Sequence, residues 1–207
     1  MDVETEFLTG LLELGYGEPV EEKLKLLAPK IFWARGWPED KKAFWNAEAF
    51  MWGHKIGREA RVLLTRELSF LRSGRNLDLG CGAHSYVPSV GLDFSEKMLQ
   101  YNDQCPEKIL GDLEQPLPFD DSQFDSVTLV FVLNYIKNYR ALLQEVQRVL
   151  RPEGKCIAVL SAPGINSWQR QKEVNAFSPS TWQDILHSCG FKGEWQEKKS
   201  LYFFSYE

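Results

Sequence analysis

The segment Leu77–Gly82 constrains the fold of this 207-residue chain more than any other. It reads Leu-Asp-Leu-Gly-Cys-Gly, so a short apolar strand runs directly into two glycines, Gly80 and Gly82. Glycine has no Cβ, which lets the backbone turn sharply and lets a ligand approach it closely. A glycine-rich turn after a strand builds ligand sites at the carboxyl ends of the strands in open α/β sheets. The segment therefore predicts such a sheet, with a ligand site at this edge.

The chain from Arg75 onward alternates short apolar strands with helices, which is typical of a mostly parallel sheet. Strands are expected at Arg75–Leu79, Ser89–Leu92, Lys108–Leu110, Ser126–Phe131 and Lys155–Leu160. Helices are expected at Ser95–Asn102, Tyr139–Leu150 and Ser180–His187. The tail differs, because Phe191–Lys198 and Leu201–Tyr206 are two strands with almost no connection. They predict a hairpin whose last strand is antiparallel to the others, so residues 75–207 are expected to form one α/β domain.

The first 74 residues predict a helical cap. Glu39–Leu71 is the longest helical pattern, and its apolar stripe keeps a period of 3.6 residues. That stripe comprises Trp45, Ala49, Trp52, Ile56, Ala60, Leu63, Leu64, Leu68 and Leu71. A second apolar face comprises Phe44, Ala47, Phe50 and Met51. A helix that is apolar on two sides is buried on two sides. We expect the stripe to pack on the sheet domain and the second face to line a cavity near Asn134 and Tyr135; the alternative is that these aromatics are ordinary core.

Further motifs downstream resemble, in their order and spacing, the class I S-adenosylmethionine-dependent methyltransferases, most closely the branch acting on small molecules and quinones. The matching segments are Leu77–Gly82, Val90–Met98, Gly111–Leu113, Pro116–Phe119, Phe124–Val127 and Val149–Gly154. The resemblance implies a Rossmann-like fold and S-adenosylmethionine as cofactor. It places Asp93 at the ribose hydroxyls and Asp112 at the adenine amino group, with Phe94 and Leu113 against the ring. Asp78 is expected to organise the glycine loop. The full expected cofactor set is Asp78, Gly80, Cys81, Gly82, His84, Asp93, Phe94, Asp112, Leu113 and Val130.

One departure from the family pattern lies between Gly80 and Gly91. Only ten residues separate these glycines, Pro88 is among them, and His84 stands at the family's third glycine position. The first crossover helix must therefore be missing or cut to one turn. Either an extended loop makes the connection, or the Glu39–Leu71 helix covers that face of the sheet. His84, Ser85 or an arginine from the N-terminal region would then replace the positive helix N-terminus at the cofactor carboxylate.

Fewer residues in the sequence indicate where the methyl acceptor would bind. The loop after the fourth strand contains Asn134 and Tyr135, either of which can orient an acceptor, and His54 is the candidate base. A lone histidine is more often a core or surface residue. The segment Ser161–Phe177, with Trp168, is either a lid or a connection. Methyl transfer depends mainly on in-line placement and on excluding water, so a base need not be present.

Composition narrows the remaining possibilities. A net charge of −5 argues against a nucleic-acid surface. The four cysteines are far apart and form no metal-type pair, which favours reduced thiols in a cytoplasmic protein. The N-terminus is acidic, unlike a signal peptide, and no apolar run is long enough to cross a bilayer. The oligomeric state stays open.

The sequence thus predicts a methyltransferase that acts on a small or amphipathic acceptor. One alternative is a non-catalytic binding or scaffold protein of the same fold, motivated by the shortened glycine loop. A second is a nucleotide-dependent oxidoreductase. Asp93 follows Gly80 by 13 residues, however, whereas the dinucleotide fingerprint places its acidic residue about 20 residues on.

Overall fold

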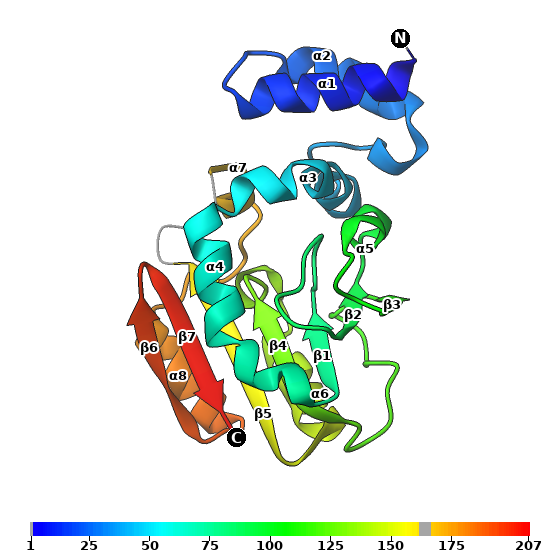
Figure 1. Ribbon diagram of the computed structural model, residues 1–207. Coiled ribbons are helices and arrows are strands. Elements are labelled where there is room, and N and C mark those ends of the chain that lie inside the picture. Colours follow the sequence, from blue (N-terminus) through cyan, green and yellow to red (C-terminus); the bar gives the residue numbers. More distant parts are fainter. Residues whose placement is uncertain (1, 162–166) are drawn as a thin grey trace.

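The computed structural model describes residues 2–161 and 167–207, without the side chains of His54, Ser167 and Trp168. A seven-stranded sheet in the order β3-β2-β1-β4-β5-β7-β6 forms its centre (Figure 1). The strands are β1 (Asn76–Leu79), β2 (Val90–Asp93), β3 (Glu107–Leu110), β4 (Phe124–Val130), β5 (Leu150–Ser161), β6 (Gly193–Lys198) and β7 (Leu201–Tyr206). Strands β1 to β5 pair in parallel, and β7 lies antiparallel to both β5 and β6. The predicted α/β fold with a reversed last strand is confirmed.

The helices of the described residues surround this sheet. They are α1 (Val3–Gly15), α2 (Glu21–Leu27), α3 (Lys41–Lys55), α4 (Arg58–Glu67), α5 (Glu96–Tyr101), α6 (Tyr139–Val149), α7 (Ser167–Arg170) and α8 (Pro179–Ser188). Short 3₁₀ turns follow α2 and α4 and lie before α6. No helix in the described ranges is both long and apolar enough to cross a bilayer.

The expectation of one helix over Glu39–Leu71 is wrong. The helix stops at Lys55, because Ile56 (φ −88°, ψ 103°) and Gly57 (φ −55°, ψ 150°) leave the helical region before α4 begins. Glycine is a poor helix former, and Ile56 is buried in the core at the break. The break redirects the chain, so α3 lies across the carboxyl edge of the sheet while α4 runs along its face (Figure 1).

Each face of the sheet has its own helical cover. Helices α6 and α8 bury Val146 and Trp182 against one face, with Leu129 of β4 among their partners. Helices α3 and α4 bury Trp52, Leu64 and Leu68 against the other face. The chain between Gly82 and Val90 contains no helix, which confirms the predicted loss of the first crossover helix. Helices α3 and α4 cover that face in its place.

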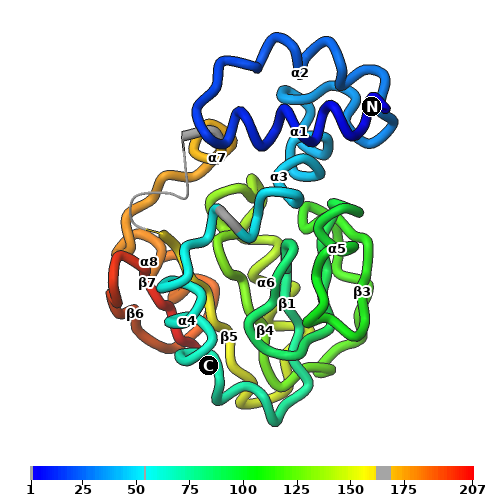
Figure 2. Tube along the Cα trace, turned by 45° about the horizontal axis from the view of Figure 1, so that its top comes forward, coloured from blue at the N-terminus to red at the C-terminus, as the bar shows by residue number. Residues whose placement is uncertain are grey.

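Helices α1 and α2 pack on α3 rather than on the sheet. Phe7, Leu11 and Leu24 of α1 and α2 form a separate core cluster with Trp37 and Ala47. Asp40 caps α3 by accepting a hydrogen bond from the backbone N–H of Ala43 at 2.8 Å. In Figure 2, α3 accordingly lies between the α1–α2 pair and the carboxyl edge of the sheet.

Candidate functional site

A cleft lies at the carboxyl ends of β1, β2 and β4, under α3. The sheet side contributes Gly80, Gly82, Asp93, Phe94, Met98, Asp112, Leu113, Val130, Phe131, Val132, Tyr135 and Ile136. Helix α3 contributes Lys41, Trp45 and Trp52. The lining is mostly apolar with a few polar groups, as in a small-molecule site.

The glycine loop forms the floor of this cleft. Gly80 (φ +64°) and Gly82 (φ +56°) both occupy the left-handed region, which residues with a Cβ adopt at a cost. A Cβ on Gly80 would lie 2.7 Å from Cγ2 of Val132. The backbone N–H groups of Gly80 and Cys81 both donate to the carbonyl of Leu92, at 2.7 and 3.1 Å, which ties the loop to β2. These hydrogen bonds fix the floor of the cleft, and the absence of a Cβ at Gly80 leaves the space above it open for a ligand.

Asp93 lies at the end of β2, where its two carboxylate oxygens have different partners. Oδ2 accepts a hydrogen bond from the backbone N–H of Gly82 at 2.9 Å, and Oδ1 accepts one from Ser95 at 2.8 Å. Burial raises the pKa of Asp93 to about 6, although these hydrogen bonds oppose the rise. A carboxylate has about four acceptor positions, so Asp93 keeps capacity for a ligand in the cleft.

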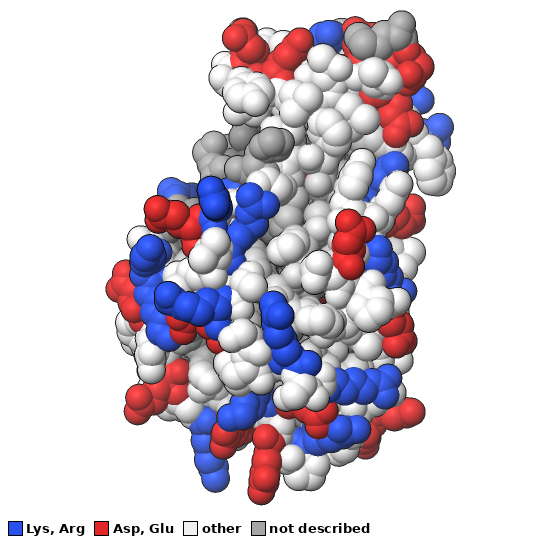
Figure 3. Space-filling model, viewed as in Figure 1, with Lys and Arg blue, Asp and Glu red and all other residues white. Residues whose placement is uncertain are grey.

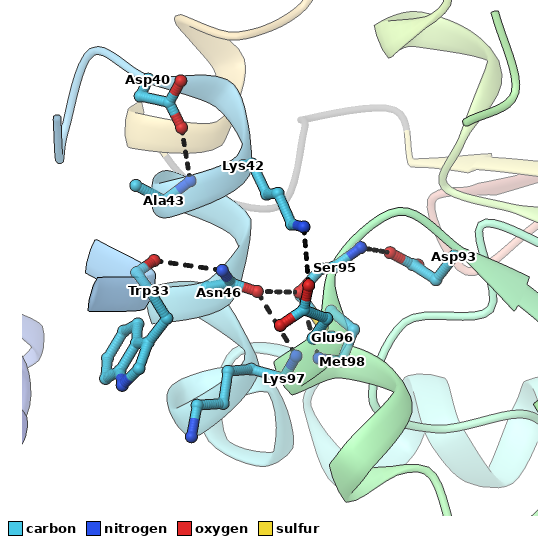
Figure 4. A network of polar contacts seen from close by, with 10 residues as sticks. All are labelled: Trp33, Asp40, Lys42, Ala43, Asn46, Asp93, Ser95, Glu96, Lys97 and Met98. Atoms are coloured by element: carbon cyan, nitrogen blue, oxygen red, sulfur yellow. Dashed lines mark hydrogen bonds and ion pairs between the residues drawn. The ribbon is translucent and has the colours of Figure 1, made fainter. Parts of the chain in front are cut away.

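A polar network connects this strand end to α3 (Figure 4). The hydroxyl of Ser95 donates to Oδ1 of Asn46 at 2.7 Å and accepts from the N–H of Met98, so Ser95 caps α5. Asn46 also donates to the carbonyl of Trp33 at 3.1 Å. These buried hydrogen bonds fix the position of α3, which covers the cleft, relative to Asp93.

Asp78 is buried next to the glycine loop and holds two side chains by hydrogen bonds. It accepts hydrogen bonds from the hydroxyls of Ser85 (2.5 Å) and Thr128 (2.7 Å), and burial raises its pKa to about 6. Asn102 donates to the carbonyls of Cys81 and Gly82 at 3.2 and 3.0 Å. Sequence reasoning missed Asn102, because nothing in the local pattern connects it with a loop twenty residues away.

An aromatic wall closes the cleft at the end of β4. The Trp45 ring lies edge-on to Tyr135 at 5.0 Å and to Trp52 at 6.3 Å, measured between ring centroids. Burial raises the pKa of Tyr135, so its hydroxyl stays protonated at neutral pH. Phe131, also in the lining, has φ +60°, and such strained backbone in a non-glycine residue is typical of functional sites.

This arrangement corrects the expected roles of the two apolar faces of α3. The Trp45–Trp52 stripe packs on the sheet domain as predicted, and it also lines the cleft near Tyr135. Phe44 and Met51 border a different hollow, between α3 and α1. Periodicity groups side chains on a face but does not say which face meets the strand ends.

Several other expected site residues lie outside the cleft. Asn134 donates to Oε1 of Glu173 at 3.4 Å, and its carbonyl accepts from the N–H groups of Val174 and Asn175. Cys81 is buried against Leu99 and Cys105. The buried Ser85 faces Asp78, as described above, and is not among the residues lining the cleft. The side chains of His54 and Trp168 lie outside the described part of the structure.

His84 borders a smaller hollow that adjoins the cleft. Its ring is half-buried and lies edge-on to Tyr86, with 5.1 Å between ring centroids.

Lys41 lines the main cleft and was also missed by sequence reasoning. Its Nζ lies 5.3 Å from the centroid of the Phe94 ring. Its spacing of four and eleven residues from Trp45 and Trp52 places it on the same helix face, which is a signal that the sequence does contain.

Comparisons with known proteins agree with this geometry. Residues 77–158 match a family model described as a methyltransferase domain. The chain is 33% identical over 123 residues to the demethylmenaquinone methyltransferase of Staphylococcus carnosus, covering 51% of this chain and 49% of that protein. It is 30% identical over 138 residues to that of Bacillus cereus, covering 58% and 57%. The chain spans about half the length of the curated relatives it matches.

Solved structures show the same fold. A methyltransferase of Thermotoga maritima superposes with a TM-score of 0.61 at 18% identity, over 77% of this chain and 93% of that one. A methyltransferase of Archaeoglobus fulgidus gives 0.60 at 16% identity, over 76% and 99%. The predicted Rossmann-like fold and the resemblance to class I methyltransferases are confirmed.

Proposed function

We propose that this chain, which carries a class I S-adenosylmethionine-dependent methyltransferase domain, binds that cofactor under α3 and transfers its methyl group to a small acceptor. One observation carries the proposal: Gly80, Gly82, Asp93 and Asp112 come from three strand ends and meet in one cleft. Their order in the sequence is the one that the resemblance implies, although the interval between Gly80 and Asp93 is shortened.

The residues present fit the cofactor. Asp93 has free acceptor positions at the end of β2, where ribose hydroxyls can donate to it. Asp112 is exposed, and its Oδ1 accepts from the N–H of Glu114 at 3.0 Å, so the carboxylate keeps capacity for an adenine amino group. Phe94 and Leu113 offer apolar surface beside these carboxylates. A Cβ on Gly80 would fill part of this cradle.

The cofactor supplies an activated methyl group on a sulfonium ion. The aromatic wall of Trp45, Trp52 and Tyr135 excludes water from the end of β4, and aromatic faces attract cations. The hydroxyl of Tyr135 stays protonated and can orient an acceptor. We place this role on Tyr135 and not on Asn134, which points to the chain around Glu173.

The acceptor is proposed to be a small, largely apolar ring compound. Two features support this: the mostly apolar lining of the cleft, and the demethylmenaquinone named in the relatives at 30–33% identity. A polynucleotide would require a basic groove. We propose that residues 1–74 act as a cover that brings α3 over the cleft. A cytoplasmic location stays a prediction.

Calorimetric titration with S-adenosylhomocysteine, the demethylated cofactor, tests the proposal. Asp93→Asn should weaken binding roughly ten- to a hundredfold, because a charge-assisted hydrogen bond contributes about 1.5–3 kcal/mol. Asp120→Asn is the matched control, since Asp120 is exposed on a loop away from the cleft and should leave affinity unchanged. Preferential binding of a nicotinamide dinucleotide would overturn the assignment. Binding without turnover on any demethylated quinone or phenol would favour the scaffold alternative.

A further inference from the structure

The chain over residues 169–175, which we call the strap, connects the two sides of the aromatic wall that closes the cleft. One side is the turn Leu133–Tyr135, and the other is α3 with Trp45. In Figure 1 the strap leaves α7 beside α3 and the chain runs back to α8 on the sheet domain. It bonds to both sides, and each attachment is described in turn below.

Asn175 attaches the strap to the turn that carries Tyr135. Asn175 is buried, and its side-chain amide donates to the carbonyls of Leu133 and Ile136 at 3.3 and 2.6 Å. Two backbone N–H groups of the strap donate to the carbonyl of Asn134, at 2.8 and 3.1 Å. A buried polar group that loses its partner costs about 1–3 kcal/mol, so the turn is held on the strap. The backbone on both sides of Tyr135 is thereby fixed.

Gln169 attaches the other end of the strap to α3. Its side chain is fully buried, and Nε2 donates to Oε2 of Glu48 at 2.7 Å. Glu48 is three residues after Trp45, so this bond lies within one helical turn of the aromatic wall. The face shown in Figure 3 carries mostly uncharged side chains over α3, between the α1–α2 pair and the basic side chains over α4. Buried polar contacts such as this one, more than surface ion pairs, therefore hold α3 on that side.

Lys172 makes a further attachment near the start of α3. Its Nζ donates to the carbonyl of Pro38 at 2.7 Å and lies 5.0 Å from the centroid of the Phe44 ring. The Phe44 ring in turn lies edge-on to Trp45, with 5.4 Å between ring centroids. The strap thus contacts the chain on both sides of Trp45 as well as on both sides of the Tyr135 backbone.

We propose that Asn175 is a positioning residue that acts through Tyr135. By fixing the turn, it holds the Tyr135 ring in the cleft, edge-on to Trp45 at 5.0 Å between centroids. The tyrosine hydroxyl can then orient the methyl acceptor, a role that rests on the proposed function. In-line transfer depends on accurate placement of the acceptor, so a displaced Tyr135 lowers the rate even though the cofactor still binds. The strap is accordingly part of the acceptor side of the site.

NMR of the free protein tests the positioning directly. In wild-type protein with protons only on Tyr and Trp, edge-on rings 5.0 Å apart should give a nuclear Overhauser cross-peak between Tyr135 and Trp45. Its absence in Tyr135→Phe assigns it. Asn175→Leu keeps a similar side-chain size but removes the amide donors, and it should abolish the cross-peak. Asn76→Leu is the matched control, because Asn76 is also buried and donates to a backbone carbonyl, that of Pro88, at 3.1 Å but does not line the cleft.

The control should lose stability and keep the cross-peak. An unchanged cross-peak in Asn175→Leu, or an equal loss in Asn76→Leu, would overturn the inference. Asn175→Ser keeps one donor and should weaken the cross-peak without abolishing it. It replaces Asn175→Leu if that variant does not fold, and an unchanged cross-peak in Asn175→Ser would then overturn the inference.

A double-mutant cycle tests whether this positioning matters for methyl transfer, with 1,4-naphthoquinol as the acceptor. Tyr135→Phe removes one hydrogen-bonding group and should lower kcat roughly tenfold. Asn175→Leu should lower kcat by no more than this and leave the calorimetric affinity for S-adenosylhomocysteine unchanged. The double variant should have the same kcat as Tyr135→Phe, because Asn175 acts through Tyr135.

The outcomes of the cycle separate this inference from the proposed function. Additive losses in the double variant, or a weaker affinity for S-adenosylhomocysteine in Asn175→Leu, would show that Asn175 acts through the fold of the cleft and would overturn the inference. No turnover by the wild-type chain, or an unchanged kcat in Tyr135→Phe, would instead contradict the proposed function. The cross-peak comparison needs no substrate and would still decide whether Asn175 positions Tyr135.

Discussion

Replacing Gly80 with alanine tests whether the floor of the cleft is as tightly fitted as the structure shows. The residue has φ +64°, and the left-handed conformation costs an L-residue roughly 1–2 kcal/mol. The new Cβ would also lie 2.7 Å from Cγ2 of Val132 and 3.2 Å from its Cγ1. Such overpacking costs about 1–3 kcal/mol. We therefore expect Gly80→Ala to lower the free energy of unfolding by about 2–5 kcal/mol.

Urea denaturation measures this free energy, and a double-mutant cycle with Val132→Ala separates its two causes. The cycle should show a favourable coupling of about 1–3 kcal/mol, because the smaller side chain relieves the contact but not the backbone strain. Gly53→Ala is the matched control. Gly53 lies in α3 with nothing within 4 Å of a new Cβ, so this variant should be as stable as the wild type or more stable. Unchanged stability in Gly80→Ala, or a cycle without coupling, would refute the reasoning.

Two further predictions concern titration and the core. Burial raises the pKa of Asp93 to about 6, and ribose hydroxyls need its ionised form as acceptor. The affinity for 5′-methylthioadenosine should therefore fall as the pH is lowered through about 6, and titrations from pH 5 to 8 should show no such fall in Asp93→Asn. Trp182 is fully buried against Tyr139 and Phe177, so Trp182→Ala should cost about 3–5 kcal/mol of unfolding free energy in urea. Trp182→Phe should cost clearly less, because Nε1 of Trp182 has no partner among the described residues; an equal cost would contradict this.

Features set by neighbours in the chain could be predicted from the sequence. The strand, the two glycines and Asp93 belong to one short stretch, and the interval up to Gly91 was too short for a helix. The loop between Gly82 and Val90 is accordingly non-helical. The start of α5 at Ser95 could be predicted for the same reason, since a capping hydroxyl bonds to an N–H three residues on.

Features that depend on contacts across the fold could not be predicted in this way. A helical period continues through Ile56 and Gly57, so only tertiary packing shows that the chain turns there. The roles of Asn134 and Tyr135 were indistinguishable in sequence, because both follow β4 by a few residues. The 3₁₀ turn at Leu133–Tyr135 directs the first toward Glu173 and the second into the cleft.

The shortened loop also changes how the two parts of the chain depend on each other. Without a crossover helix, one face of the sheet has Trp52, Leu64 and Leu68 of the N-terminal region as its core partners. Burying side chains of this size contributes about 1.5–3 kcal/mol each, which is a large share of the stability of a typical domain. We infer that the sequence boundary near residue 74 does not divide two folding units. Helix α3, which belongs to that core, also brings Trp45 and Trp52 to the cleft, so we infer that the N-terminal region contributes to the site as well as to the core.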